Sequence, residues 1–268
     1  MSGRTLSPPA QPQRWALLLQ YDGSEFAGSQ WQPQLPTVQG ALEHALAALT
    51  DPAAKQPPIR VSLSGRTDAG VHASGQVAAF TSTYELTARR WIRGLNHFLP
   101  DAVAVQAAQP VAPTFDPRRD AVARSYSYRL RIAAQRQPLW VNRAWVVNPP
   151  FDPSTARSAL AELVGRRDFA AFSPPTSERS SVRTLHSAEL TGADANWECR
   201  FRADAFLQHQ VRRMVGAVVD VARGRVTLDT FRHHLRTAAP GALGPTAPAN
   251  ALTLARVEYD RSVLSDWE

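Results

Sequence analysis

The sequence contains very little cysteine and very little lysine. Among its 268 residues there is one cysteine, Cys199, and one lysine, Lys55. A single cysteine cannot form a disulfide within the chain or a cysteine-based zinc cluster. Because the lone lysine lies in the segment DPAAKQPP, the Gly-Lys-Ser/Thr loop that holds nucleotide phosphates is absent. The motifs of dinucleotide-binding domains, zinc proteases and serine hydrolases are absent as well.

Long apolar runs are also missing, and we expect no signal peptide. No stretch approaches the roughly 20 apolar residues needed to cross a bilayer. The first residues, MSGRTLSPPAQPQ, lack the apolar centre of a signal peptide. The adjacent His233 and His234 point to different sides of a predicted helix, which argues against a shared metal site. We therefore expect a cytoplasmic protein with no membrane contact and no metal.

Arginine is abundant. The chain has a net charge of +7 and a pI near 10.4, and 29 of its 30 basic residues are arginine. Residues 1–110 contribute a net charge of +1 and residues 111–268 contribute +6. This excess is typical of proteins that bind a polyanion such as nucleic acid. An arginine-rich surface that is simply solvated explains the same numbers, so composition leaves both interpretations open.

Hydrophobic periodicity predicts alternating strands and helices in two halves of similar order. The proline-rich stretch 109–119 separates them. We expect a flexible tail over 1–13, an N-terminal domain over 14–112 and a C-terminal domain over 113–268. Closely spaced strands favour antiparallel pairing, and hence an α+β fold. Strands are predicted at 14–21, 59–64, 75–81, 102–108, 121–132, 182–190, 196–204 and 251–259, and helices at 37–50, from 87, from 152, at 206–224 and from 227.

The most distinctive segment is Ser64–His72, which reads SGRTDAGVH and follows a predicted strand. Its two glycines allow unusual backbone conformations and the close approach of a ligand. Between them Arg66 supplies a permanent cation and Asp68 a carboxylate, which suits a site that acts on a polyanion. The alternative is a tight turn in which Thr67 and Asp68 bond their own backbone. By contrast, Cys199 alternates inward with its apolar neighbours, which predicts a buried, unreactive thiol.

The segment GRTDAGVHASGQVAAF resembles the catalytic signature of the tRNA pseudouridine synthase A family. Other blocks resemble that family in the same order, so that the similarity covers about residues 14 to 260. These blocks are LLLQYDGSEFAG, TVQGALEHAL, RDAVARSYSYRLRI, DFAAFS with VRTL, FLQHQVRRMVGAVVDVARG and TAPANALTLARVEY.

This resemblance implies a fold and an activity. The fold has two similar domains, each a mostly antiparallel sheet flanked by helices, and the sheets meet at a central catalytic cleft. The activity is the isomerisation of uridine to pseudouridine at positions 38, 39 and 40 of the tRNA anticodon stem-loop. The family needs no cofactor, binds tRNA and acts as a homodimer.

The resemblance also implies roles for particular residues. Asp68 corresponds to the nucleophile, and a nearby cation should keep it ionised. Arg212 corresponds to the helix arginine beside that carboxylate. Arg66 corresponds to the arginine that fills the space left by the extruded base. Tyr126 corresponds to the tyrosine that stacks on this base, although Tyr128 lies on the same face of the predicted strand.

Two further residues are assigned from their position. Arg124 shares the face of Tyr126 and is expected to support the site or to contact a phosphate. Leu252 is expected to line the pocket, although Asn250 and Ala251 stand where the family commonly has a glycine before this leucine.

The stretch from Gly28 to Gln34 also departs from the family pattern. It is two residues longer than the usual Gly-Trp-Gln segment after the first strand. We expect this insertion to alter a loop that faces RNA and to leave the catalytic loop untouched.

Two other functions remain compatible with these residues. A non-catalytic RNA-binding module could use the same scaffold, and it would be favoured if Asp68 were missing. An N-glycosidase could use the same carboxylate, and it would release free uracil instead of pseudouridine.

Overall fold

The computed structural model describes residues 11–51, 57–174, 180–237, 239–264 and 267. By its internal contacts the chain forms two compact units, Met1–Val122 with Arg256–Glu268, and Ala123–Ala255. The domain limits predicted at residues 112 and 113 stay a prediction. Of the predicted tail, residues 1–10 lie outside the described part, and Gln13 already belongs to the first strand.

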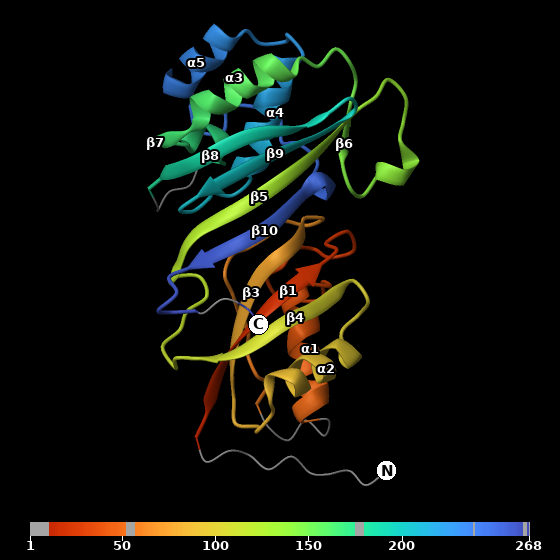
Figure 1. The fold of residues 1–268 in the computed structure, drawn as a ribbon, viewed down its shortest axis with the longest axis vertical. Helices are drawn as coiled ribbons and strands as arrows, with labels where there is room; N and C mark the ends of the chain where they lie inside the picture. Colours follow the sequence, from red (N-terminus) through yellow and green to blue (C-terminus); the bar gives the residue numbers. More distant parts are fainter. Residues whose placement is uncertain (1–10, 52–56, 175–179, 238, 265–266, 268) are drawn as a thin grey trace. The chain divides into compact units, whose positions relative to one another are not determined.

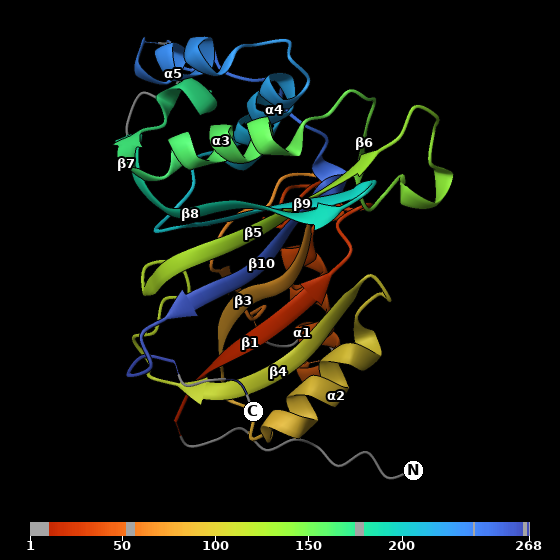
Figure 2. The ribbon, with the colours of Figure 1, turned by 45° about the horizontal axis from the view of Figure 1, so that its top comes forward.

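The first unit contains an antiparallel sheet with β1 at its centre. β1 (Gln13–Tyr21) pairs with β3 (His72–Ser82) on one side and with β4 (Val103–Val111) on the other, and the short β2 (Ser62–Leu63) pairs with β3. Helices α1 (Val38–Thr50) and α2 (Ala88–Phe98) pack on one side of these strands (Figures 1 and 2).

Both helices of this unit begin where the sequence predicts. The Thr37 hydroxyl accepts a hydrogen bond from the Gly40 N–H at 3.1 Å, and Thr87 accepts one from the Arg90 N–H at 3.3 Å. These side chains satisfy backbone donors that the first turn of a helix leaves unpaired. In the first turn of α2, Trp91 is fully buried, and its ring centre lies 5.0 Å from that of Phe80 in β3. This contact anchors α2 to β3.

β2 is shorter than the predicted strand over 59–64. The Val61 N–H donates to the carboxylate of the buried Glu43 in α1 at 3.0 Å, instead of joining a sheet ladder. Arg60 forms an ion pair of 2.9 Å with the same carboxylate. A helix side chain therefore takes the place of a neighbouring strand, and strand pairing starts only at Ser62.

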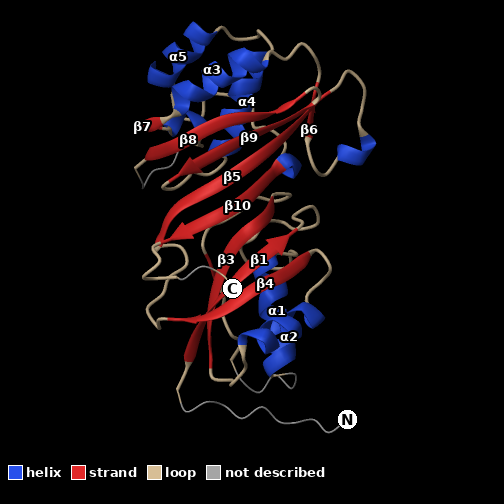
Figure 3. Cartoon of the chain, viewed as in Figure 1, coloured by secondary structure: helices blue, strands red, loops and turns tan. Residues whose placement is uncertain are grey.

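The second unit also has a mostly antiparallel sheet. Its strands lie in the order β5, β9, β8, β7, and the short β6 runs parallel to β5. Helices α3, α4 and α5 gather together beside β7 and β8 (Figure 3). The bounds are β5 Ala121–Ile132, β6 Trp145–Val147, α3 Pro153–Leu163, β7 Gly165–Asp168, β8 Val182–Ala193, β9 Asn196–Ala203, α4 Gln210–Ala222 and α5 Leu228–Thr237. The last strand, β10 (Leu252–Tyr259), begins in this unit and continues into the first unit from Arg256.

Helix α4 begins four residues later than predicted, at Gln210 instead of Phe206. His209 has a φ of 60°, a left-handed conformation that a right-handed helix cannot contain. The predicted start of α3 is confirmed, because Asp152 accepts hydrogen bonds from Ser154 and Thr155 and Pro153 occupies the first helical position. The predicted α+β class is confirmed in both units.

Candidate active site

The loop between β2 and β3 carries Arg66, which is exposed, and Asp68, which is half-buried. Gly70 has a φ of 79°, so glycine is needed there. Gly65 is different, because its φ is not positive and an added Cβ would meet nothing within 4 Å. The space beside Gly65 therefore leaves room for a ligand to approach the backbone.

Thr67 does not bond its own turn, as the alternative interpretation of this loop required. Its hydroxyl lies 2.8 Å from the hydroxyl of Tyr21 at the end of β1. Its N–H donates to the Ser29 hydroxyl at 2.8 Å, and its carbonyl accepts from the Ser29 N–H at 3.1 Å. The residue before Asp68 is thus held by two distant segments of the first unit.

The longer stretch around Ser29 lies against the catalytic loop, because Ser29 is fully buried and bonds Thr67 twice. That the two extra residues leave the catalytic loop untouched stays a prediction. Gly28 has a φ of 111°, and an added Cβ would lie 2.9 Å from the Thr67 carbonyl oxygen. The chain turns back here between β1 and α1, and the backbone of this turn lies in close contact with the Asp68 loop.

In the second unit, Arg212 lies near the start of α4. Its Nε–H donates to the carbonyl of Ala247 at 2.7 Å, and the Ala247 N–H donates back to the Arg212 carbonyl at 3.3 Å. The hydroxyl of the fully buried Tyr128 donates to Pro248 at 2.8 Å. Burial raises the pKa of Tyr128, and the nearby positive charge of Arg212 lowers it in part. The segment 247–248 therefore orients both side chains.

Tyr126 and Arg124 are oriented by the segment that follows β9. The ring of Tyr126 meets that of Phe206 edge-on at 5.2 Å, and Arg124 Nη1 donates to the Asp204 carbonyl at 2.8 Å. Tyr126 is half-buried, whereas its neighbour Tyr128 on the same face is enclosed. Leu252 is buried at the start of β10.

Arg66 and Asp68 thus share one loop of the first unit, and the other four predicted residues belong to the second. That the two groups act together stays a prediction. Sequence reasoning missed Tyr21, Ser29 and Gln76 as partners of the loop. One signal was available for Gln76, because it is the polar residue inside the apolar stretch GQVAAF.

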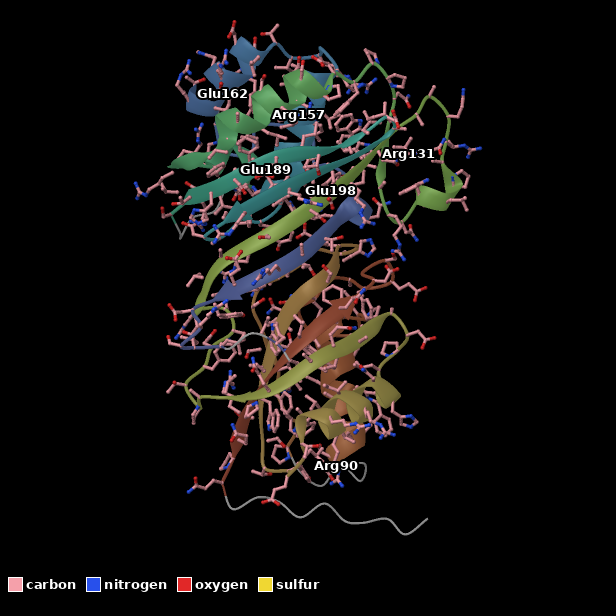
Figure 4. All side chains as sticks on the ribbon, viewed as in Figure 1. Arg90, Arg131, Arg157, Glu162, Glu189 and Glu198 are labelled. Atoms are coloured by element: carbon pink, nitrogen blue, oxygen red, sulfur yellow. The ribbon has the colours of Figure 1, made fainter. Side chains whose placement is uncertain are left out.

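Several arginines of the second unit are engaged in contacts of their own. Arg131 and Arg157, both labelled in Figure 4, lie over tryptophan rings. The guanidinium carbon of Arg131 is 5.2 Å from the ring centre of Trp140, and that of Arg157 is 5.4 Å from the ring centre of Trp197. Arg200 pairs with Glu198 at 2.7 Å. Further ion pairs join Arg225 to Asp220 and Arg232 to Glu162 and Asp229. Part of the arginine excess is therefore structural.

The described residues offer neither a membrane-spanning helix nor a cluster of metal ligands. None of the helices within them is long and apolar enough to cross a membrane. In the same part of the chain, no three His, Cys, Asp or Glu residues are grouped so that they could hold a metal ion.

Comparison with known proteins assigns the family. The sequence profile of a family described as "tRNA pseudouridine synthase" matches residues 18–118 and 159–260. A tRNA pseudouridine synthase A of Chloroflexus aurantiacus is 43% identical over 251 residues, which cover 91% of this chain and 88% of that protein. Proteins of the same name from Burkholderia cenocepacia and Neisseria meningitidis serogroup B are each 40% identical and cover 92% and 93% of this chain, and 90% and 93% of their own lengths.

The chain therefore belongs to the tRNA pseudouridine synthase family, and it is an isomerase. Among solved structures, a dye-decolorizing protein from V. cholerae aligns over 85% of this chain and 91% of its own with 11% identity and a TM-score of 0.22. This score is too low to indicate a shared fold.

Proposed function

We propose that this chain isomerises uridine to pseudouridine at positions 38, 39 and 40 of the tRNA anticodon stem-loop, with Asp68 as the nucleophile. The observation that carries the proposal is the placement of Asp68 on a loop whose preceding residue is bonded to β1 and to the Ser29 turn, in a chain of this family. The reaction breaks the N1–C1′ bond, turns the base and joins C5 to C1′. A carboxylate can serve it as it serves retaining glycosidases.

The other residues would prepare the substrate. A base in a stem must leave its stack before an enzyme can reach it. We propose that Arg66, exposed on the loop, fills the space left behind, and that the half-buried ring of Tyr126 stacks on the extruded base. The contact with Phe206 supports this role. The two rings meet edge-on, and this contact fixes the orientation of the Tyr126 ring.

Arg212 would act as the cation beside Asp68, and Arg124 and Leu252 would complete the surroundings of the base. The Nε–H of Arg212 donates to the Ala247 carbonyl, which orients the guanidinium. A bidentate guanidinium is well suited to hold a carboxylate in its ionised form.

Asp68→Asn tests the proposal directly. Because C5 loses its hydrogen when it joins C1′, release of tritium from tRNA labelled at C5 of uridine measures turnover. We expect Asp68→Asn to lower turnover by a factor of about 10³ or more, since no nucleophile remains. Its tRNA affinity should stay close to that of the wild type. Full turnover by this variant would contradict the assignment.

The same assay separates the alternatives. Transcripts in which the uridines at 38, 39 and 40 are replaced by cytidine should release no tritium. A wild-type protein that binds tRNA without turnover would indicate a binding module, and free uracil would indicate an N-glycosidase. The homodimer and the cytoplasmic location remain predictions. A solution mass of about twice the 29.4 kDa of the chain would support the dimer.

A further inference from the structure

Five buried polar side chains lie together beneath the Asp68 loop. They come from β1, the turn before α1, the start of the loop, the loop itself and β3, and each is at most 5% exposed. The set is Tyr21, Ser29, Ser64, Thr67 and Gln76. Buried polar groups are costly unless they are hydrogen-bonded, and a cluster of them specifies one arrangement only when every member is paired.

The orientation of the Gln76 amide in this cluster is determined by its partners. Gln76 Nε2 lies 3.0 Å from the carbonyl of Gly65, which can only accept, so the amide nitrogen must face it. The amide oxygen then faces the Ser64 hydroxyl at 2.6 Å, and Ser64 donates. The same Nε2 also donates to the Tyr21 hydroxyl at 3.4 Å.

Tyr21 connects Gln76 to Thr67. Burial raises the pKa of Tyr21, so its hydroxyl keeps its hydrogen. The phenol oxygen accepts from Gln76. The Tyr21 hydroxyl also lies 2.8 Å from the Thr67 hydroxyl, and either of the two can donate.

As a result, every polar atom of Thr67 is bonded. Its N–H and carbonyl pair with Ser29, and its hydroxyl pairs with Tyr21. On the other side of Asp68, the Val71 N–H donates to the Asp68 carbonyl at 3.1 Å, and the Gly70 N–H donates to Phe26 at 3.3 Å. The backbone of Asp68 is thus fixed from both directions.

We propose that this cluster sets the position of the Asp68 carboxylate for attack, with Tyr21 and Ser29 as positioning residues that act through Thr67. The inference rests on the proposed role of Asp68 as nucleophile. Reactions that depend on near-contact geometry are sensitive to small shifts, and a displacement of about 1 Å can cost about 100-fold in rate. The cluster would therefore act on the chemical step and leave tRNA affinity unchanged.

The test compares single-turnover rates and tRNA dissociation constants for Thr67→Val, Thr67→Ser and Tyr21→Phe. Valine has the shape of threonine without the hydroxyl. We expect Thr67→Val and Tyr21→Phe each to slow the chemical step by about 10- to 100-fold, with the dissociation constant within about twofold. Thr67→Ser keeps the hydroxyl and should restore the rate to within about threefold of the wild type.

A double variant tests the coupling. Tyr21→Phe and Thr67→Val remove the same hydrogen bond, so together they should be no slower than the slower single variant. Thr50→Val is the matched control, because Thr50 is also buried in the first unit and its hydroxyl bonds only the Leu46 carbonyl within α1, at 2.7 Å. Thermal unfolding confirms that each variant is folded at the assay temperature.

Wild-type rates for both Thr67→Val and Tyr21→Phe would overturn the proposal. A loss in Thr50→Val as large as theirs would overturn it too, because the effect would then be general destabilisation. These outcomes are distinct from a failure of the proposed function. If Asp68→Asn keeps its turnover, the function fails whatever the cluster variants do. If Asp68→Asn is inactive and the cluster variants are fully active, only the positioning role fails.

Discussion

The two units hold their candidate site residues by different means. In the first unit, the Asp68 loop is supported by side chains, above all Tyr21 and Ser29. In the second, Arg124 and Arg212 donate to the main-chain carbonyls of Asp204 and Ala247. A substitution can delete a supporting side chain, whereas it cannot delete a carbonyl. The Asp68 loop should therefore be sensitive to substitution of its supporting residues, whereas Arg124 and Arg212 should be sensitive mainly to substitution of the arginines themselves.

Among the residues that support the site residues, the largest effect is expected at Gly28, which lies in close contact with the Asp68 loop. Gly28→Ala combines a strained φ with a Cβ only 2.9 Å from the Thr67 carbonyl oxygen, so the loop must move. Turnover should fall by about 100-fold. The unfolding free energy should fall by more than the roughly 1–3 kcal/mol that strained backbone alone costs. Chemical denaturation and the tritium assay measure the two quantities.

Gly165 in the second unit is the matched control for this variant. It has nearly the same φ, 113° against 111°, and an added Cβ there meets nothing within 4 Å. Gly165→Ala should therefore show the backbone cost without the loss of turnover. Equal losses of turnover in the two variants would argue that the Thr67 contact is unimportant.

A smaller effect is expected for Arg212→Lys. Lysine keeps the charge but has no Nε–H to donate to Ala247, so the cation is no longer oriented. We expect turnover to fall by about tenfold with little change in stability. Arg213→Lys is the control, because Arg213 donates to Gly241 instead and has no proposed role at the site. If both lysine variants behave alike, orientation by Ala247 does not matter.

Two variants of Tyr126 distinguish stacking by its ring from hydrogen bonding by its hydroxyl. Tyr126→Phe keeps the ring against Phe206 and should keep most of the activity. Tyr126→Ala removes the ring, and stacking of one base on an aromatic ring is worth about 1–3 kcal/mol. We therefore expect substrate affinity, measured with an anticodon stem-loop transcript, to weaken by about 5- to 150-fold. A phenylalanine variant as weak as the alanine variant would point to the hydroxyl.

The smallest effect is expected at Cys199. It is fully buried in β9, and burial raises the pKa of its thiol to about 12. Only about one thiol in 10⁴ would be ionised at pH 8, and the thiolate is the reactive form. Iodoacetamide should leave the native protein unlabelled and active, and should label it in urea. Rapid labelling under native conditions would contradict this prediction, because it would show that β9 unfolds locally and exposes Cys199.

Local features of the fold were predictable because they depend on neighbouring residues. Thr37, Thr87 and Asp152 cap helices as expected, and β5 has its predicted bounds. The delayed start of α4 was not predictable, because the helical periodicity continues through His209 while its backbone does not. The short β2 likewise depends on Glu43, a residue of α1 that is distant in sequence.

The site could be predicted in part. The loop was recognised from its own residues, and the roles of Asp68, Arg66 and Tyr126 came from the family resemblance. The support beneath the loop was missed, because its members are separated by up to 55 positions along the chain. No local pattern indicates that the Tyr21 hydroxyl and the Gln76 amide will meet.

The sequence by itself determined the lack of a disulfide framework, the excess of arginine, the alternating elements and the family of the chain. Composition, spacing and motif order contain that information directly. Only the tertiary structure decided that Ser29 and Tyr21 bond Thr67. It also decided that several arginines lie over tryptophan rings or form ion pairs with carboxylates. Buried polar groups must find partners wherever the folded chain brings them, and those partners are chosen by space and not by sequence distance.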